Sequence, residues 1–147
     1  MTDLIILISL IALGYFAGSR AEKKHYLSIN KREEEFLYMP AVTVKNAPQI
    51  DIAQSKLVTG SVVISVDYFK RILAGLRAIV GGRVKSYETL LDRARREAVL
   101  RMKEKVRSAD MIVNLRIETS SISKGRRQKS VGTVEALAYG TAIRFKK

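Results

Sequence analysis

The hydrophobic pattern of the chain begins with one unbroken apolar run. Residues 4–18 carry no charge, and Ser9 is their only clearly polar side chain. A helix over residues 2–19 would be roughly 27 Å long at ~1.5 Å per residue, which is short but sufficient to cross the hydrocarbon core of a bilayer. The pattern therefore predicts a transmembrane anchor over residues 1–19.

The charges around this run predict its orientation. The three residues before it contain no lysine or arginine, which a secretory signal normally carries there. Arg20, Lys23 and Lys24 follow it instead, and positively charged flanks stay on the cytoplasmic side of a membrane. We therefore expect a single-pass protein of the cell's inner (plasma) membrane, with its N-terminus outside and with Tyr15 and Phe16 at the inner interface. A cleaved signal and a buried helix of a soluble protein are the competing interpretations.

A charged segment follows the apolar run. Residues 21–39 contain neither proline nor glycine, and this favours a helix that ends before Pro40 and leads into an irregular linker. The acidic run Glu33–Glu35 is interpreted as a solvated helical face. Residues 20–55 are thus expected to form a helical neck and linker to a globular domain over residues 56–147.

The rest of the pattern predicts a small α+β domain. Runs rich in β-branched residues indicate strands, and apolar residues at helical spacing indicate two helices. The expected elements are a strand Lys56–Val66, a helix Tyr68–Val80, a helix from Tyr87 to about Arg107, a strand Met111–Thr119 and a strand Val131–Phe145. The order is β-α-α-β-β, with the helices on one face of an antiparallel sheet. Gly60 marks a bulge or a close approach of another backbone.

The second predicted helix of the domain has two faces of different composition. Its apolar face is expected to point inward, and its charged face outward. The inner face consists of Tyr87, Leu90, Leu91, Ala94, Ala98, Met102 and Val106, and the outer face includes Arg93, Arg96, Glu97, Arg101 and Lys103.

The last predicted strand is apolar on both faces, and one face carries a run of small residues. The helices of a small domain cover only one face of its sheet, so a neighbouring subunit is expected to cover the other. The residues assigned to this oligomer interface are Ala136, Ala138, Tyr139, Gly140 and Ala142.

The amino-acid composition restricts the partners, metal sites and catalytic activities that the chain can have. The 147 residues include 27 Lys and Arg against 14 Asp and Glu, and the net charge of +13 favours anionic partners such as phospholipid headgroups, nucleic acid or acidic protein surfaces. The absence of cysteine excludes disulfides, thiolate metal sites and a cysteine nucleophile, and His25 is the single histidine. No base–nucleophile pair can be nominated, so neither enzymatic activity nor a cofactor is expected.

Two basic regions are candidate anion sites. The turn between the two helices could form a backbone nest, or it could be a glycine cap that needs no ligand. The loop before the last strand could contact lipid headgroups or RNA phosphates, or it could be a solvated hairpin tip. The turn residues are Arg77, Gly81, Gly82, Arg83 and Ser86, and the loop residues are Lys124, Arg126, Arg127 and Lys129. No nucleic-acid motif is present, so nucleic acid is not an expected partner.

Short motifs in the last three-fifths of the chain carry a family resemblance. They are Thr59-Gly60, Phe69, Arg77, Ile79-Val80-Gly81-Gly82-Arg83, Tyr87, Ala94-Arg95, Ala98, Ala109-Asp110 and Ala138-Tyr139-Gly140-Thr141-Ala142. Together they resemble the YbjQ family, which also carries a heavy-metal-binding label. The chain departs from the family pattern at Ser108 and at Met111-Ile112.

The resemblance implies a β-α-β-β type subunit, related in shape to dodecin subunits, that assembles into a ring, commonly a pentamer. It brings no established activity. A metal site is not expected in this chain despite the label, because soft metals prefer thiolate or imidazole ligands and the carboxylates of the domain are scattered.

Two functional hypotheses result from these features. The first is a non-enzymatic, membrane-anchored oligomeric scaffold or partner-binding ring on the cytoplasmic face. The second is a ring-shaped binding module for a small anionic ligand or RNA.

Overall fold

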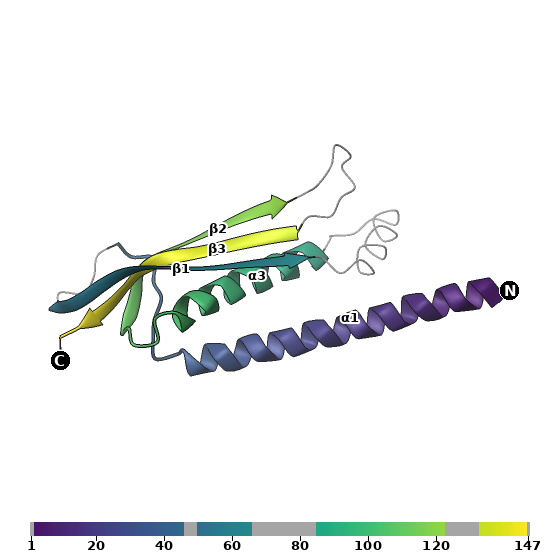
Figure 1. The fold of residues 1–147 in the computed structure, drawn as a ribbon, viewed down its shortest axis with the longest axis horizontal. Helices are drawn as coiled ribbons and strands as arrows, with labels where there is room; N and C mark the ends of the chain where they lie inside the picture. Colours follow the sequence, from purple (N-terminus) through teal and green to yellow (C-terminus); the bar gives the residue numbers. More distant parts are fainter. Residues whose placement is uncertain (1, 46–49, 66–84, 123–132, 147) are drawn as a thin grey trace.

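The computed structural model describes residues 2–45, 50–65, 85–122 and 133–146. Their elements are α1 (Thr2–Glu35), β1 (Ile52–Ser65), α3 (Lys85–Glu104), β2 (Met111–Ile122) and β3 (Thr133–Phe145). The strands form an antiparallel sheet in the order β1-β3-β2 (Figure 1). The predicted α+β architecture with an antiparallel sheet is therefore confirmed, whereas the helix predicted at Tyr68–Val80 lies outside the described residues.

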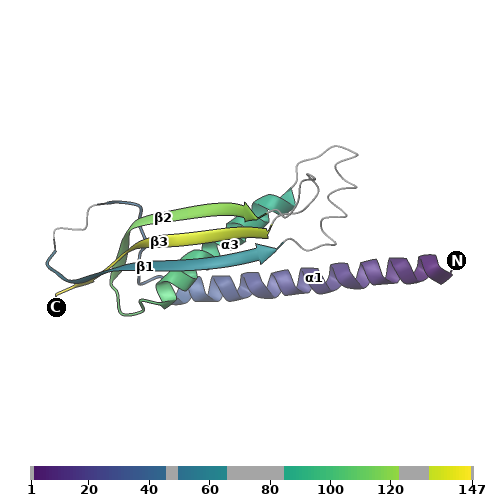
Figure 2. The ribbon, with the colours of Figure 1, turned by 45° about the horizontal axis from the view of Figure 1, so that its top comes forward.

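The elements form three layers. In Figures 1 and 2, α3 lies along one face of the sheet, and the second half of α1 runs beside α3. The first half of α1 continues past the domain. A single 34-residue helix thus joins the predicted anchor to the predicted neck without a break.

The core lies between the sheet and α3 and also includes α1. Ile29 of α1 is 0% exposed, and Phe36 and Met39, just after α1, are 1% and 0% exposed. All three belong to the same buried cluster as Ala98 of α3 and Val62 of β1. Residues of the predicted neck are therefore part of the hydrophobic core.

Gly60 allows α3 to lie directly on the sheet. A Cβ added at Gly60 would overlap the backbone of Ala98 and Met102, and it would lie 2.9 Å from the Met102 Cα. The pairing of β1 with β3 is regular at this point, so Gly60 is a close-approach position and not a bulge.

The small-residue face of β3 is covered by the chain's own helix. Ala136 and Ala138 are fully buried and Ala142 is 5% exposed, because narrow side chains let α3 pack closely against this face. A Cβ at Gly140 would lie 2.9 Å from the Ile112 Cγ2 atom of β2. The assignment of these four residues to a subunit interface is therefore wrong. Tyr139, the remaining residue of that set, alternates onto the opposite face and is half-buried.

A bulge in β2 disrupts an alternation that the sequence of this strand shows. Met111, Val113, Leu115 and Ile117 alternate with Asn114, Arg116 and Glu118, which predicts that the apolar set faces inward. The pairing register shifts between Val113 and Arg116, and Asn114 has a φ of 53°. As a result Ile112 and Val113 are both buried, whereas Ile117 is 37% exposed although the alternation placed it inward.

The segment after α1 extends the sheet beyond β2. The Val42 N–H donates to the Ile112 carbonyl at 2.9 Å, and the Ile112 N–H donates to the Pro40 carbonyl at 2.9 Å. The Asn114 N–H, at the bulge itself, donates to the Val44 carbonyl at 2.8 Å. Part of the predicted irregular linker is thus hydrogen-bonded along the outer edge of β2.

Candidate functional site

The N-terminal half of α1 exposes apolar side chains on every side. Leu4, Leu13 and Phe16 are 61%, 66% and 64% exposed. Within the described ranges, α1 is the one helix long and apolar enough to cross a membrane, and no residue of its most apolar stretch is buried in the chain. A soluble core helix would bury these side chains, so this surface is compatible with a membrane anchor.

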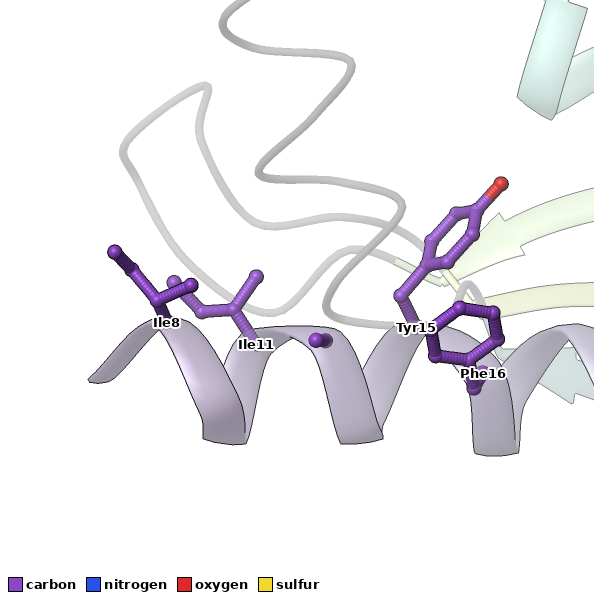
Figure 3. A pocket seen from close by; sticks show the side chains of 5 residues that line it. Ile8, Ile11, Tyr15 and Phe16 are labelled. Atoms are coloured by element: carbon purple, nitrogen blue, oxygen red, sulfur yellow. The ribbon is translucent and has the colours of Figure 1, made fainter. Parts of the chain in front are cut away.

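A shallow apolar hollow lies on the same half of α1. It is lined by Ile8, Ile11, Ala12, Tyr15 and Phe16, most of them visible along one side of the helix in Figure 3. The rings of Tyr15 and Phe16 meet edge to face, with centroids 6.0 Å apart. Among the described residues the lining is apolar apart from the Tyr15 hydroxyl, so it suits acyl chains or another apolar surface.

The C-terminal half of α1 is attached to α3 by polar contacts along its length. Near the start, the Tyr26 hydroxyl donates to the Thr89 carbonyl at 3.0 Å. At the other end, the Tyr38 hydroxyl, just after α1, donates to the Arg107 carbonyl at 3.0 Å. Because residue numbers rise together on the two helices, α1 and α3 run parallel.

Arg96 forms the outer part of this contact. Its Nε donates to Glu33 Oε1 at 2.8 Å, and its Nη2 donates to Asn30 Oδ1 at 2.6 Å. The Glu33 hydrogen bonds raise the pKa of Arg96 above its ordinary value, and burial opposes this only in part. Glu33 therefore faces α3, and the prediction of a solvated face holds only for Glu34 and Glu35, which are exposed.

Glu97 lies at the centre of the contact and is 4% exposed. The Arg32 guanidinium donates to both of its carboxylate oxygens, and the Arg101 Nε donates to Oε1 at 3.0 Å. Arg32 also pairs with Glu104 at 3.2 Å, and His25 Nε2 lies 3.4 Å from Glu97 Oε2. We call these five residues the Glu97 cluster. The prediction that Glu97 lies on a charged outer face is wrong, because α1 covers that face.

Opposing effects determine the ionisation of Glu97. Burial by itself would raise the pKa of this carboxyl group, but the hydrogen bonds from Arg32 and Arg101 outweigh it and hold the pKa below its ordinary value. The same Glu97 contact raises the pKa of Arg32. Both groups are therefore charged at neutral pH, and the pair is a full ion pair between α1 and α3.

Acid should weaken this attachment. Glu97 has a lower pKa in the folded protein than the ordinary value of about 4.3, so its contribution to the free energy of unfolding is present above roughly pH 4.5 and is lost as the pH falls through the folded pKa. We expect Glu97→Gln to destabilise the protein by about 2 kcal/mol near neutral pH, with the difference from wild type shrinking in acid. Denaturant unfolding in detergent micelles, followed by circular dichroism, measures both effects.

The exposed Glu34 provides the control, because Glu34→Gln removes the same charge from α1 without touching α3. A Glu97→Gln variant that kept the full pH dependence of the wild type would contradict this role for Glu97.

Cations at the end of α3 and just after it also bind β1, an outer strand of the described sheet. The Arg101 Nη1 donates to the Ser61 carbonyl at 3.1 Å, and the Lys105 Nζ donates to the Thr59 carbonyl at 2.8 Å. Exposed edge strands invite pairing with other chains, and charged side chains at the edge oppose this. Arg101 belongs to the Glu97 cluster as well, so α1 is connected through Glu97 to the edge of the sheet.

The candidate anion sites are mostly beyond what the structure describes. Ser86 falls in the first turn of α3, but its side chain is not among those described. The others, Arg77, Gly81, Gly82, Arg83, Lys124, Arg126, Arg127 and Lys129, lie outside the described residues. Of the predicted membrane flanks, Tyr15, Phe16, Arg20, Lys23 and Lys24 are all exposed on α1.

The Glu97 cluster was not predicted from the sequence. Its signal was the spacing of Glu22, His25, Arg32 and Glu33 on one side of a helix that also carries Ile29 and Phe36. Residues at this spacing share one helical face, and that face matched the charged face of α3. The signal was visible in the sequence, but nothing in the sequence indicated that the two faces meet.

Comparison with known proteins establishes the family. An α+β domain with an N-terminal helix is the class that the fold defines, and residues 39–146 match the family YbjQ_1, described as "Putative heavy-metal-binding". The chain belongs to this family. The matched region begins after α1, so the long helix lies entirely outside it.

Relatives share the domain. The chain is 39% identical over 107 residues to a UPF0145 protein of Archaeoglobus fulgidus, covering 71% of this chain and 93% of the relative. It is 38% identical over 106 residues to one of Vibrio campbellii, covering 70% and 95%. A crystal structure of a DUF74 protein of unknown function from Pediococcus pentosaceus aligns with 74% of this chain and 98% of that one, at 17% identity and a TM-score of 0.40.

The residues do not fit the metal that the family description implies. The chain has no cysteine, and its one histidine, His25, lies against the Arg32–Glu97 ion pair. Across the described ranges, no three His, Cys, Asp or Glu side chains come together in a way that could hold a metal ion. Soft metals require thiolate or imidazole groups, which this chain cannot gather in number.

Proposed function

We propose that this protein is a non-enzymatic scaffold or partner-binding domain held on the cytoplasmic side of the cell's inner (plasma) membrane by α1. One observation carries the proposal: the two halves of a single helix have opposite surroundings. The first half exposes Leu4, Leu13 and Phe16, whereas the second half buries Ile29 in the domain and leads directly into the buried Phe36. A helix with these two halves suits a protein that joins a bilayer to a folded domain.

The charge distribution supports the orientation. Arg20, Lys23 and Lys24 are exposed on α1 immediately after the apolar run, where they would resist translocation. Asp3 is the only charged side chain before the run. The N-terminus is therefore proposed to lie outside and the domain in the cytoplasm.

The proposed scaffold is a homo-oligomeric ring, commonly a pentamer in proteins that this chain resembles. The surface available to a neighbour is the sheet face opposite α3, where Leu57 and Val63 are 68% and 54% exposed. The alternative function, a module for a small anionic ligand or RNA, rests on basic residues outside the described part of the chain. We therefore favour the scaffold.

A pair of reporter fusions tests the anchor and its orientation. Fluorescent protein fused after Lys147 should fluoresce, and alkaline phosphatase fused at the same position should be inactive, because the C-terminus is cytoplasmic. Replacing Arg20, Lys23 and Lys24 with asparagine and Thr2 with lysine should shift part of the population to the opposite orientation. Strong phosphatase activity of the unmodified fusion would overturn the proposed topology, and release of the protein by alkaline carbonate would overturn the anchor.

A further inference from the structure

The attachment of α1 to α3 determines where the domain sits relative to a bilayer, if α1 spans it as proposed above. α1 is continuous from Thr2 to Glu35, so its apolar half and its attached half share one axis. Contacts to α3 and its end extend from Glu22, whose Oε1 is 4.0 Å from Arg93 Nη1, to Tyr38. Within α1 this contact runs from Glu22 to Glu35, fourteen helical residues that span roughly 20 Å at ~1.5 Å each, and a contact of that length prevents pivoting.

The level of α3 along α1 can be read from one hydrogen bond. Tyr26, whose hydroxyl donates to the Thr89 carbonyl, is seven residues beyond Ser19, which is roughly 10 Å of helix at ~1.5 Å per residue. α3 runs parallel to α1 and begins at Lys85, four residues or roughly 6 Å nearer the apolar run. This hydrogen bond places the start of α3 about 5 Å beyond the apolar run, and the pair of Glu22 with Arg93 places it further toward that run. The start of α3 therefore lies beside the end of the apolar run, at the headgroup layer of a spanned bilayer.

One end of the sheet lies at the same level. Ser65, Thr133 and Ile122 form its last row, because Thr133 pairs with both of the others. Figures 1 and 2 show this end of the strands beside the start of α3, on the side toward the N-terminus of α1. The strands run roughly along α1 in both views, so the opposite end of the sheet points away from the proposed membrane.

We infer that this end of the domain is a membrane-facing surface whose partner is the phospholipid headgroup layer. The attached half of α1 holds the row Ser65–Thr133–Ile122 and the start of α3 at that layer, with the strands along the membrane normal. The exposed cations Arg20, Lys23 and Lys24 lie at the same level, so the layer they fit is anionic. The domain stands on the bilayer surface and does not hang from a flexible tether.

The cysteine-free chain permits a direct test with single labels at native serines. Ser65→Cys and Ser55→Cys place the same probe on the same exposed face of β1, ten residues or roughly 33 Å apart. Ser9→Cys places it in the apolar run. Each full-length variant is labelled with a maleimide fluorophore and reconstituted into phosphatidylethanolamine–phosphatidylglycerol vesicles that carry a nitroxide quencher either on the headgroup or in the acyl chain.

The headgroup quencher should quench the Ser65 probe several-fold more than the Ser55 probe, and the acyl-chain quencher should quench the Ser9 probe. Nitroxide is present in both leaflets, so the direction of insertion does not affect the result. Equal quenching at residues 55 and 65 with the Ser9 probe in the acyl chains would overturn the membrane-facing surface and leave the anchor standing. A Ser9 probe that the acyl-chain quencher does not reach would overturn the anchor itself, and this inference with it.

Weakening the ion pairs between α1 and α3 tests whether these pairs set the orientation of the domain. Arg32→Ala with Arg96→Ala removes the main ion pairs to α3 and should lower the ratio of quenching at residue 65 to that at residue 55. The matched control, Lys31→Ala with Arg95→Ala, removes two exposed charges from neighbouring positions and should leave the ratio unchanged. Circular dichroism verifies that both double variants stay folded. An unchanged ratio in the first variant would overturn the role of the ion pairs in setting the orientation.

Discussion

Deletion of residues 1–19 should leave a folded domain that no longer binds membranes, whereas deletion of residues 1–39 should destabilise the domain severely. The longer deletion removes Ile29, Phe36 and Met39, which are essentially fully buried. Burying such a side chain contributes about 1.5–3 kcal/mol, so their joint loss approaches the whole stability of about 5–15 kcal/mol of a typical domain. It also leaves the buried Glu97 without Arg32, which adds a desolvation cost.

Fragments 20–147 and 40–147 are the pair to compare. Both keep the segment that pairs with β2, so they differ only in residues 20–39, which are the attached half of α1 and the turn from Phe36 to Met39. Urea unfolding measures their free energies of unfolding. Within fragment 20–147, Ile29→Ala should cost about 2–5 kcal/mol, and Leu27→Ala, at a 69% exposed position on the same helix, should cost less than about 0.5 kcal/mol. Equal stability of the two fragments would show that α1 is a passive tether.

The substitution Gly60→Ala should be among the most damaging single changes in the chain. The added Cβ would overlap backbone atoms of Ala98 and Met102, which cannot rotate away as a flexible side chain could. α3 would have to move off the sheet, and overpacking of this kind costs about 3 kcal/mol or more. We expect a fall of that size in the free energy of unfolding and, since α3 carries Glu97, a weaker attachment of α1.

Ser61→Ala is the control for this change. Ser61 is the next residue on β1, it is exposed, and its contact with Arg101 uses the backbone carbonyl, which alanine retains. Its effect should remain within about 0.5 kcal/mol. A Gly60→Ala variant as stable as Ser61→Ala would contradict the close approach of α3 to β1.

The two kinds of contact between α1 and the domain differ in the free energy that they contribute to stability. The buried side chains Ile29 and Phe36 contribute most of the free energy, since partly exposed ion pairs are worth about 0–1 kcal/mol each. The ion pairs of Arg32 and Arg96 define the position of α1 relative to α3, because each guanidinium must meet a carboxylate on the facing helix. Apolar burial therefore holds α1 to α3, and charge pairing selects its position along α3.

Local patterns in the sequence predicted the elements well where a single period dominates. The apolar run and the charged helix after it are one helix, and the strands near Gly60 and Tyr139 are present. In β2 the alternation of apolar and polar residues predicted the buried side chains wrongly, because the bulge at Asn114 shifts the pairing register. No local pattern in the sequence predicts that an asparagine has a positive φ. The limits of β1 were also misjudged, since Ile52 pairs with Phe145 across the sheet and that pairing is non-local.

The class of the domain, the family resemblance, the apolar span and the lack of soft metal ligands can all be predicted from the sequence, because composition, short motifs and short-range periodicity carry this information. Which faces meet can be seen only in the folded chain. The charged face of α3, at Arg96 and Glu97, is as polar as a solvated surface, yet it is covered by a helix more than sixty residues earlier in the chain. The face of β3 that carries small residues such as Ala138 could pack closely against a helix or against another subunit, and in the structure it packs against α3. Complementary surfaces distant in sequence leave no periodic signal, so their pairing becomes visible only when the chain is folded.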